Sequence, residues 1–360
     1  MHNSNLSDSI KDLFKSKGID LVGFSKIQNI KDFDYMNDWL KNGFHAEMKY
    51  LENPKRQEPA SSIDSSYVSV ISCAINYNLF DIRENSLNSK KNNMAWIARY
   101  AVIDDYHKIL KKLIDNLMQE VLKIHKLNYK VYIDTGPLLE RAYSKYAGIG
   151  WVGKNSCIIN KELGSFFFLC EILIDKPLIY DNPVNEMCGT CTKCIDSCPT
   201  NAIVKNKQID SNKCISYLTI ENKNTIDNDL ASQISNNVYG CDICQEVCPW
   251  NRRVKIKENF NWNIRNYFIS PDLNELLDLI ENNWEEIKIN SPLKRAKKQG
   301  LIRNILLAMA NTKDKKYLKR IKYYLTNENQ VLATTAKQAI FIIDKSVSYT
   351  HLTLPTTPYV

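Results

Sequence analysis

The order of apolar and polar positions divides the chain at about residue 180. Before that point, short continuous apolar runs alternate with amphipathic stretches, a mixture typical of an α+β or α/β domain. The stretch DYHKILKKLIDNLMQEVLKIH, 105–125, has leucine, isoleucine and valine at helical spacing and predicts one long helix whose apolar face packs into the core. The runs that predict strands are SYVSVISCAINY (66–77), KVYID (130–134), NSCIIN (155–160) and FFFLCEILI (166–174).

After Trp250 the pattern becomes helical. Four amphipathic stretches with short polar connections predict antiparallel helix pairs stacked in the manner of an α-helical repeat, although no strict period is present. The stretches are PDLNELLDLIENNWEEI (271–287), SPLKRAKKQGLIRNILLAMAN (291–311), DKKYLKRIKYYL (314–325) and NQVLATTAKQAIFIID (329–344). The last fifteen residues are rich in Thr and Pro, and we expect them to be disordered or foreign to the fold. The expected division is 1–180, 181–256, 257–345 and the tail 346–360, with the Pro- and Asn-rich segment 177–187 as a linker.

Composition and charge narrow the class of protein. The N-terminal region has neither an apolar signal segment nor paired arginines, and no window offers eighteen uncharged apolar residues, so we expect a soluble cytoplasmic protein. The net charge of +8 is unevenly spread. Residues 291–325 hold eleven Lys or Arg and one acid, Asp314. This basic face either meets phosphates or is an ordinary solvated helix surface, and the sequence alone favours neither.

Eight of the eleven cysteines fall between Cys188 and Cys248. In a reducing compartment they indicate metal or redox chemistry rather than disulfides. The first group has the CxxCxxCxxxCP spacing of bacterial ferredoxins. The second ends in CP but lacks its leading cysteine, which the separate Cys214 can supply. Because the fourth cysteine of each run crosses to the other cluster, we predict two 4Fe-4S clusters, one on Cys188, Cys191, Cys194 and Cys248 and the other on Cys198, Cys214, Cys241 and Cys244.

Zinc is the alternative for these thiols, but zinc sites use two CxxC pairs rather than a triple followed by CP. The remaining cysteines, Cys73, Cys157 and Cys170, lie in apolar runs and are expected to be small buried hydrophobic residues.

Two clusters move single electrons, so a partner protein or an organic cofactor must exchange them. The chain has no GxGxxG after a strand, which argues against a Rossmann site for flavin or nicotinamide. DDYHKIL also fails to complete the DxHxxG pattern that gives a histidine to cobalt in many cobalamin enzymes, because Leu110 stands where glycine belongs.

Several blocks together resemble the epoxyqueuosine reductases, cobalamin and iron–sulfur enzymes that complete queuosine in transfer RNA. The resemblance spans about residues 5–343 and implies a cobalamin-binding α/β domain, an inserted two-cluster ferredoxin-like domain and HEAT-like C-terminal helices, with an overall α+β class. The blocks are RYAVIDDYHK (99–108), DTGPLLERAYSKYAGIGWVGKNSCII (134–159), CGTCTKCIDSCPTNAI (188–203), CISYLTIE (214–221) and GCDICQEVCPWN (240–251).

The resemblance implies a reaction in which the epoxide of epoxyqueuosine becomes the alkene of queuosine and its oxygen leaves as water. Asp134, at the end of KVYID, matches the family's proton donor. Burial beside an apolar corrin face would raise its pKa, as a general acid requires. The alternative is that Asp134 caps a helix beginning near Pro137. Without the histidine, the cobalt would lack a strong lower ligand and be easier to reduce.

The family pattern also implies binding residues. Gly153 and Asn155 have an alternative role in a tight turn, Ser216 as an exposed polar residue, and Arg141 in a salt bridge near Glu140. The residues expected to contact cobalamin are Arg56, Arg99, Asp134, Gly153, Lys154, Asn155, Ser156, Ser216, Thr219 and Asp242. Those expected to contact the tRNA are Arg141, Arg252, Arg253, Lys294, Arg295, Lys297, Lys298 and Arg303.

We further expect a monomer that receives electrons from a flavodoxin or ferredoxin system and has neither a membrane nor DNA as a partner. Three other readings remain open: a reductive dehalogenase, which would carry a twin-arginine signal and lack the basic tail; an electron carrier without corrinoid; and a zinc-stabilised RNA-binding module.

Overall fold

The computed structural model describes residues 2–79, 93–252, 254, 256, 260 and 262–349. Its contacts separate two compact units that are interleaved along the chain. Unit 1 consists of the described residues up to 79 together with 99–214 and 242–264, and unit 2 of 93–98, 215–241 and 265–349. This division differs from the consecutive segments expected from the sequence, because the cysteine-rich region contributes to both units. No helix among the described residues is long and apolar enough to cross a membrane.

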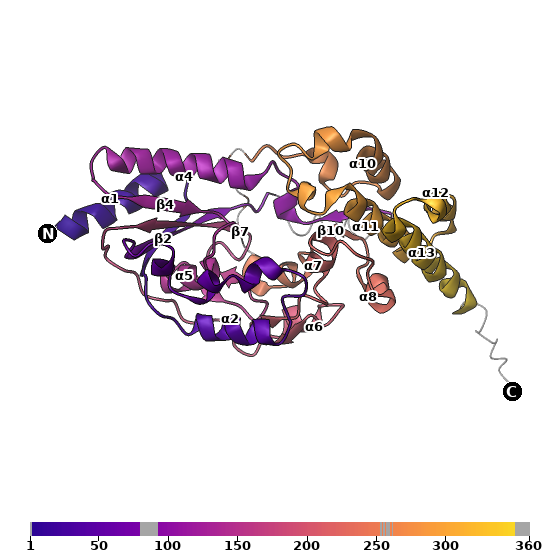
Figure 1. Ribbon diagram of the computed structural model, residues 1–360, viewed down its shortest axis with the longest axis horizontal. Helices are drawn as coiled ribbons and strands as arrows, with labels where there is room; N and C mark the ends of the chain where they lie inside the picture. Colours follow the sequence, from indigo (N-terminus) through magenta and orange to yellow (C-terminus); the bar gives the residue numbers. More distant parts are fainter. Residues whose placement is uncertain are drawn as a thin grey trace, which may run out of the picture. The chain divides into compact units, whose positions relative to one another are not determined.

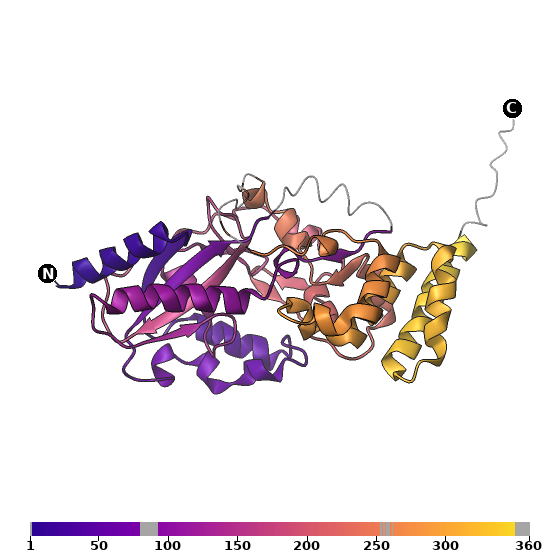
Figure 2. The ribbon, with the colours of Figure 1, turned by 90° about the horizontal axis from the view of Figure 1, so that it is seen from above.

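Unit 1 is built on a four-stranded sheet in the order β1-β2-β7-β4, with every neighbouring pair antiparallel. Every residue of β2 is buried, as expected for a central strand covered on both faces. Helices α1 and α4 lie on one face and α5 and α2 on the other (Figure 1), and Figure 2 shows α1 and α4 from above. The strands are β1 (Leu21–Lys26), β2 (Ser69–Asn76), β4 (Tyr129–Tyr132) and β7 (Phe167–Ile174), and the helices are α1 (His2–Ser16), α2 (Asp32–Lys41), α4 (Tyr106–Leu122) and α5 (Glu140–Tyr146).

Helix α4 forms as its pattern predicts. The carboxylate of Asp105 caps it by accepting the His107 main-chain N–H at 3.2 Å. Its apolar stripe, from Tyr106 through Leu110 to Val121, is buried against the sheet. The predicted helix 105–125 and the strands predicted at 66–77, 130–134 and 166–174 are confirmed, whereas the run 155–160 forms a strand only at Ile158–Ile159 and β1 was not predicted.

The rest of unit 1 consists of short elements, some of which carry the cysteine segments. The hairpin β5–β6 precedes β7, and the short helices α6 and α9, which follow the first cysteines of each group, pack together. These elements are β5 (Trp151–Val152), β6 (Ile158–Ile159), α6 (Lys193–Asp196), β8 (Ile203–Lys205), β9 (Gln208–Ile209), α9 (Ile243–Glu246) and the 3-10 turns η1 (Lys49–Glu52), η2 (Pro54–Gln57), η3 (Ala60–Ser62), η4 (Arg99–Ala101) and η5 (Pro249–Asn251).

Unit 2 is helical and centres on α11, whose residues from Gly300 to Ala310 are all buried. A helix that is buried all round belongs in the middle of its unit, and α11 contacts α7, α8, α10 and α13. The four predicted C-terminal helices are confirmed, while their HEAT-like character stays a prediction. The elements are β3 (Trp96–Ile97), α7 (Ile215–Ile220), α8 (Asn228–Gln233), β10 (Asn237–Tyr239), η6 (Asn266–Phe268), α10 (Leu273–Ile287), η7 (Pro292–Arg295), α11 (Lys297–Asn311), η8 (Lys315–Tyr317), α12 (Leu318–Tyr323), η9 (Tyr324–Thr326) and α13 (Gln330–Tyr349).

Helix α13 includes the first residues of the segment that was expected to be a disordered or foreign tail. It continues through residues 346–349, which the sequence analysis assigned to a disordered or foreign segment, so these four residues are helical. The remainder of that segment, 350–360, lies outside the described residues.

Candidate functional site

The four thiols predicted for the first cluster lie together in unit 1. Cys248 packs with Trp151, Ile159 and Cys188. Burial raises the pKa of the Cys248 thiol to about 11, and the neighbouring thiols of Cys188, Cys194 and Cys191 add to the rise. Four thiolates this close would repel one another, and a cationic iron–sulfur core removes that repulsion. This donor set therefore fits a four-iron cluster.

The four thiols predicted for the second cluster do not all belong to the same unit. Cys198, Cys214 and Cys244 belong to unit 1, whereas Cys241 ends a segment of unit 2. The Cys198 sulfur accepts a hydrogen bond from the Ala202 main-chain N–H at 3.3 Å, the type of contact that stabilises a cluster ligand. The grouping of these four cysteines stays a prediction.

The three other cysteines differ in their surroundings. Cys73 and Cys170 are buried opposite each other on β2 and β7, as the sequence predicts. Cys157 is only half-buried, which corrects that prediction, and its hydrogen bond with Cys244 lowers its pKa. Within the described part of the chain, no three His, Cys, Asp or Glu side chains are placed to hold a single metal ion.

Two residues expected to contact cobalamin bind the main chain of the cysteine segments. The Lys154 ammonium donates to the carbonyl oxygens of Gly189 at 2.8 Å and Cys191 at 3.0 Å. The Asn155 amide donates to the Cys244 carbonyl at 3.3 Å. The hairpin β5–β6 thus holds both cysteine segments.

Gly153 has the turn geometry that the sequence left open. Its main-chain N–H donates to Cys157 and its carbonyl accepts from Ser156, which has a left-handed φ of 63°. A side-chain carbon on Gly153 would lie 2.4 Å from the end of the Ile159 side chain, which would have to move to admit it. The guanidinium of Arg141 donates to the Ser156 carbonyl, so this bond, rather than a salt bridge near Glu140, is what the structure gives Arg141.

The remaining expected cobalamin contacts make bonds within their own units. In unit 1, Arg99 is fully buried, with its main-chain N–H on Asp242 at 2.8 Å and its guanidinium on Glu246 at 3.2 Å. Also in unit 1, Arg56 donates to the Leu138 carbonyl at 3.4 Å. In unit 2, the buried Thr219 hydroxyl donates to Ile215 and accepts from the Gly240 N–H, while Ser216 is half-buried.

Asp134 lies in the loop between β4 and α5. The Tyr106 hydroxyl donates to its Oδ2 at 2.9 Å, and His107 Nε2 lies 3.9 Å from the same oxygen. Its main chain is left-handed, with a φ of 56°, and the carboxylate is 66% exposed. The helix-cap alternative is wrong, because α5 begins six residues later with Leu139 at the capping position.

Two further carboxyl groups, those of Glu140 and Glu171, interact with Asp134 or with each other. Glu140 Oε1 accepts the Asp134 main-chain N–H at 2.7 Å, and burial, with a contribution from the Asp134 charge, raises the pKa of Glu140 to about 8. Burial also raises the pKa of Glu171 on β7 well above its ordinary range, and Glu140 adds to that rise. Sequence reasoning missed Tyr106, His107, Glu140 and Glu171, although the first three lie in the quoted blocks 99–108 and 134–159.

The basic face of unit 2 divides into buried and exposed residues. Arg303 is fully buried, and its guanidinium donates to the carbonyls of Leu218, Asn222 and Asn224. This corrects its expected role in binding tRNA, since those bonds hold it in the interior. Lys294 and Lys297 are exposed.

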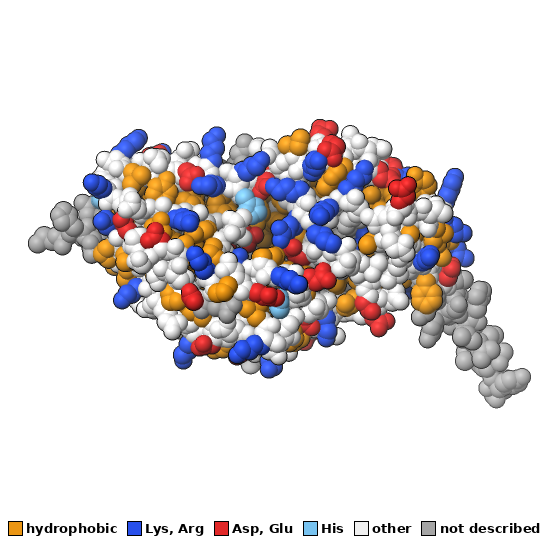
Figure 3. Space-filling model, in the orientation of Figure 1, with side chains coloured by type: hydrophobic (Ala, Val, Ile, Leu, Met, Phe, Trp, Pro, Cys, Tyr) orange, Lys and Arg blue, Asp and Glu red, His pale blue; other side chains and the backbone are white. Residues whose placement is uncertain are grey.

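Two other basic residues that were expected to contact the tRNA already bind other groups of unit 2. Arg295 pairs with Glu221 at 2.8 Å, and the half-buried Lys298 donates to the Glu281 carbonyl at 2.8 Å. In unit 1, Arg252 is exposed, and Arg253 lies outside the described residues. Figure 3 shows Lys and Arg side chains mixed with Asp and Glu on the visible face.

Comparison with known proteins gives consistent matches. Residues 187–251 match the model of a 4Fe-4S double cluster binding domain, and residues 56–135 match that of "Epoxyqueuosine reductase QueG, DUF1730". An epoxyqueuosine reductase of Aliivibrio fischeri is 37% identical over 309 residues, which are 85% of this chain and 83% of the relative. One of Cyclobacterium marinum is 38% identical over 316 residues, 82% of this chain and 94% of the relative.

Solved structures agree with these relatives. A crystal structure of epoxyqueuosine reductase with an epoxyqueuosine-modified tRNA-Tyr stem loop has a TM-score of 0.84 and 28% identity, covering 94% of this chain and 90% of that chain. An epoxyqueuosine reductase from Bacillus subtilis, with its catalytic aspartate loop swung out of the active site, has a TM-score of 0.83 and 27% identity, with the same two coverages.

Proposed function

The chain belongs to the epoxyqueuosine reductase family, and we propose that its Asp134 protonates the oxygen that leaves when epoxyqueuosine in the tRNA wobble position is reduced to queuosine. The enzyme is an oxidoreductase. The observation that carries the proposal is the hydrogen bond that the Tyr106 hydroxyl donates to Asp134. Tyr106 begins the rigid helix α4, so this bond fixes the direction of an exposed carboxylate.

The chemistry requires electrons and protons together. Opening the epoxide to an alkene breaks two C–O bonds, and the oxygen leaves as water after taking up two electrons and two protons. The two 4Fe-4S clusters carry electrons one at a time. Cobalamin, when bound, would supply a strongly reducing centre for this step. The protein's own task is to hold the epoxide beside a proton donor.

Asp134 suits that task by position. Its exposed carboxylate reaches a substrate, while the bonds to Tyr106 and Glu140 fix both its side chain and its main chain. A general acid must stand within hydrogen-bond reach of the atom it protonates, so this fixed orientation contributes directly to the rate.

Cobalamin recognition is the next part of the proposal. The hairpin residues beside the cysteine segments would hold the corrin close to the clusters, so that electrons travel a short path. Most of these residues are buried and would act by supporting the half-buried Arg56 and Ser216. The proposed set is Arg56, Arg99, Gly153, Lys154, Asn155, Ser156, Ser216, Thr219 and Asp242.

The tRNA partner is proposed from charge and from the relative that holds a modified stem loop. Exposed lysines and arginines suit phosphate contacts, and an anticodon loop can extend its base into a pocket without breaking a duplex. We assign these contacts to Lys294, Lys297 and Arg252, with Arg141, Arg295 and Lys298 as partly committed members. A flavodoxin or ferredoxin system would deliver the electrons.

The test is mass spectrometry of nucleosides from tRNA that carries epoxyqueuosine, after anaerobic incubation with reconstituted enzyme, cobalamin and reductant. Wild type should form queuosine only when cobalamin is added. Asp134→Asn should keep its clusters, its corrinoid and its RNA affinity but lose turnover by about 100-fold or more. Near-normal turnover of this variant would remove Asp134 from its proposed role.

A further inference from the structure

The reaction consumes more protons than one carboxyl group can hold. Each turnover converts the epoxide oxygen into water and consumes two protons, whereas Asp134 carries one. To serve both protonations, Asp134 must regain a proton within each turnover, and a neighbouring ionisable group can supply it. This inference rests on the proposed role of Asp134.

His107 is the ionisable ring that faces Asp134 from the first turn of α4. Its Nε2 lies 3.9 Å from Asp134 Oδ2, and its Nδ1 lies 2.8 Å from Asp105 Oδ1. The Asp105 carboxylate is buried and also caps the helix, so it is a fixed partner for the ring. With Asp105 accepting from Nδ1–H, the other nitrogen is turned toward Asp134.

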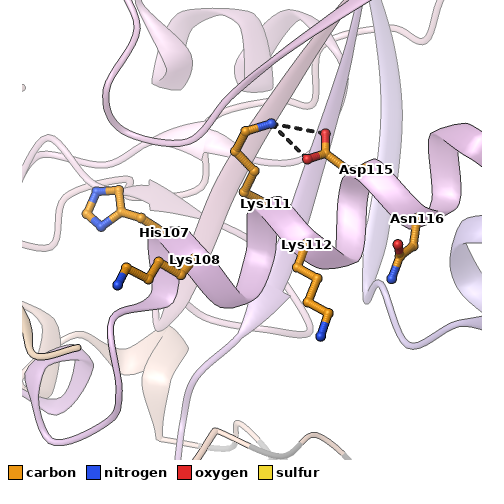
Figure 4. A pocket seen from close by; sticks show the side chains of 6 residues that line it. All are labelled: His107, Lys108, Lys111, Lys112, Asp115 and Asn116. Carbon is orange, nitrogen blue, oxygen red and sulfur yellow. Dashed lines mark hydrogen bonds and ion pairs between the residues drawn. The ribbon is translucent and has the colours of Figure 1, made fainter. Parts of the chain in front are cut away.

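Stacking fixes the ring further. The His107 ring lies on the Tyr106 ring with 4.1 Å between centroids, and Tyr106 stacks in turn on Phe168 of β7. The same Tyr106 donates to Asp134, so both neighbours of the carboxylate belong to one stacked group. Yet 35% of the His107 side chain is exposed, which gives the ring access to solvent protons (Figure 4).

We propose that His107 is a positioning residue that returns a proton to Asp134 during turnover. Asp134 first gives its proton to the leaving oxygen and becomes a carboxylate. The imidazolium then passes its Nε2 proton to Asp134 Oδ2, directly after a small loop movement or through one water, and the neutral ring recovers a proton from solvent. Asp134 gives this second proton to the same oxygen, which departs as water. Both protons thus come from solvent, and the two electrons come through the cofactors of the established reaction.

The charged groups around His107 agree with this task. Asp105 and Asp134 face its two nitrogens, with Glu140 behind Asp134. On the same helix, Lys108 and Lys111 line the surface hollow beside the ring, and Lys111 is paired with Asp115 at 2.8 Å. Figure 4 shows the ring at the start of the helix, apart from that ion pair.

The test is His107→Ala with and without added imidazole. The variant should lose about 10-fold or more in kcat with an unchanged KM for the stem loop, and imidazole should restore turnover most strongly at pH values where it is protonated. A purely structural role of the ring would not give rescue that follows the imidazolium concentration. His45→Ala is the matched control, because that ring also bonds a carboxylate, Glu52, at 2.9 Å.

A wild-type rate for His107→Ala, or a slow rate that imidazole leaves unchanged, would overturn the inference. If the alanine variant loses its cluster absorbance, His107→Gln replaces it. Glutamine keeps a polar side chain but carries no proton to give, so the same loss of kcat is expected and a wild-type rate again rejects the relay. Asp134→Asn separates the two hypotheses: if it is inactive while His107→Ala is normal, only the relay fails, and if it is active, the role of Asp134 itself fails.

Discussion

Glu140 holds the main chain of Asp134: its Oε1 accepts the Asp134 N–H at 2.7 Å across the loop that joins β4 to α5. Glu140 is the first residue of α5, which packs against the sheet, so a rigid helix fixes one end of the loop that carries Asp134. The bond also supports the left-handed backbone of Asp134, a conformation that costs free energy for residues other than glycine.

We therefore predict that Glu140→Ala lowers kcat by about 10-fold, because the Asp134 carboxylate loses its fixed orientation. Glu140→Gln should retain most of the activity, since an amide oxygen still accepts the N–H. Hydrogen exchange of residues 134–139 should rise in the alanine variant alone. Equal exchange in all three proteins would contradict the role, and Glu162→Ala, an exposed turn residue, controls for loss of a glutamate.

The raised pKa of Glu140 predicts a pH-dependent stability. The group has a pKa of about 8 when folded against 4.5 as its ordinary value, so between these values the unfolded chain releases a proton that the folded protein keeps. Stability should fall as pH rises through this window. The melting temperature of Glu140→Gln relative to wild type should therefore increase from about pH 5 to about pH 8 and then level off. Glu140 contributes to the raised pKa of Glu171, so Glu140→Gln reduces the same trend from Glu171 as well, and the sign of the difference is unchanged. A difference independent of pH would count against the shift.

Cys248 is expected to be essential for one cluster only. Cys248→Ala should lower the iron content of the anaerobically purified protein from about eight to about four atoms per chain. Cys73→Ala, which alters a buried thiol in the sheet, should keep the full content. Iron analysis together with the absorbance near the visible cluster band measures both, and full iron content in Cys248→Ala would reject the ligand assignment.

Variants at Arg303 and at the pair Lys294 and Lys297 should distinguish a loss of stability from a loss of RNA binding. Arg303→Ala removes the donor to the carbonyls of Leu218, Asn222 and Asn224, the first two in buried residues, and should cost about 3 kcal/mol of unfolding free energy. Lys294→Glu with Lys297→Glu should leave melting unchanged, weaken stem-loop binding and lower the slope of log K against log salt by about 0.7 for each lost phosphate contact. Fluorescence anisotropy and thermal melting measure the two effects. If the double variant binds normally, the basic face is only a solvated surface.

The sequence was most informative where a local pattern decides the structure. The apolar period of α4 and the continuous runs of β2 and β7 reflect burial on one or both faces, which any fold of this chain must satisfy. The strand β1 was missed because LVGFSK carries a glycine and a terminal lysine. That glycine, Gly23, is required by packing, since a side-chain carbon there would lie 1.9 Å from the Ala147 carbonyl.

The site was less predictable because its contacts join distant residues. Spacing alone grouped Cys248 with Cys188, Cys191 and Cys194, since the ferredoxin motif has a fixed geometry. No spacing rule brings Tyr106 to Asp134 or reveals that Arg303 points inward. Arg303 has three apolar neighbours in sequence, Leu301, Ile302 and Ile305, and that setting on a helix buried all round was the one available sign of its burial.

The interleaving of the two units has a consequence for synthesis. Unit 1 needs residues up to 264, and unit 2 needs both the early strand β3 and the helices from α10 onward. While the chain emerges from the ribosome, β3 must therefore wait about 140 residues for its partner β10. A chain that ended near residue 256 would therefore contain neither unit in full.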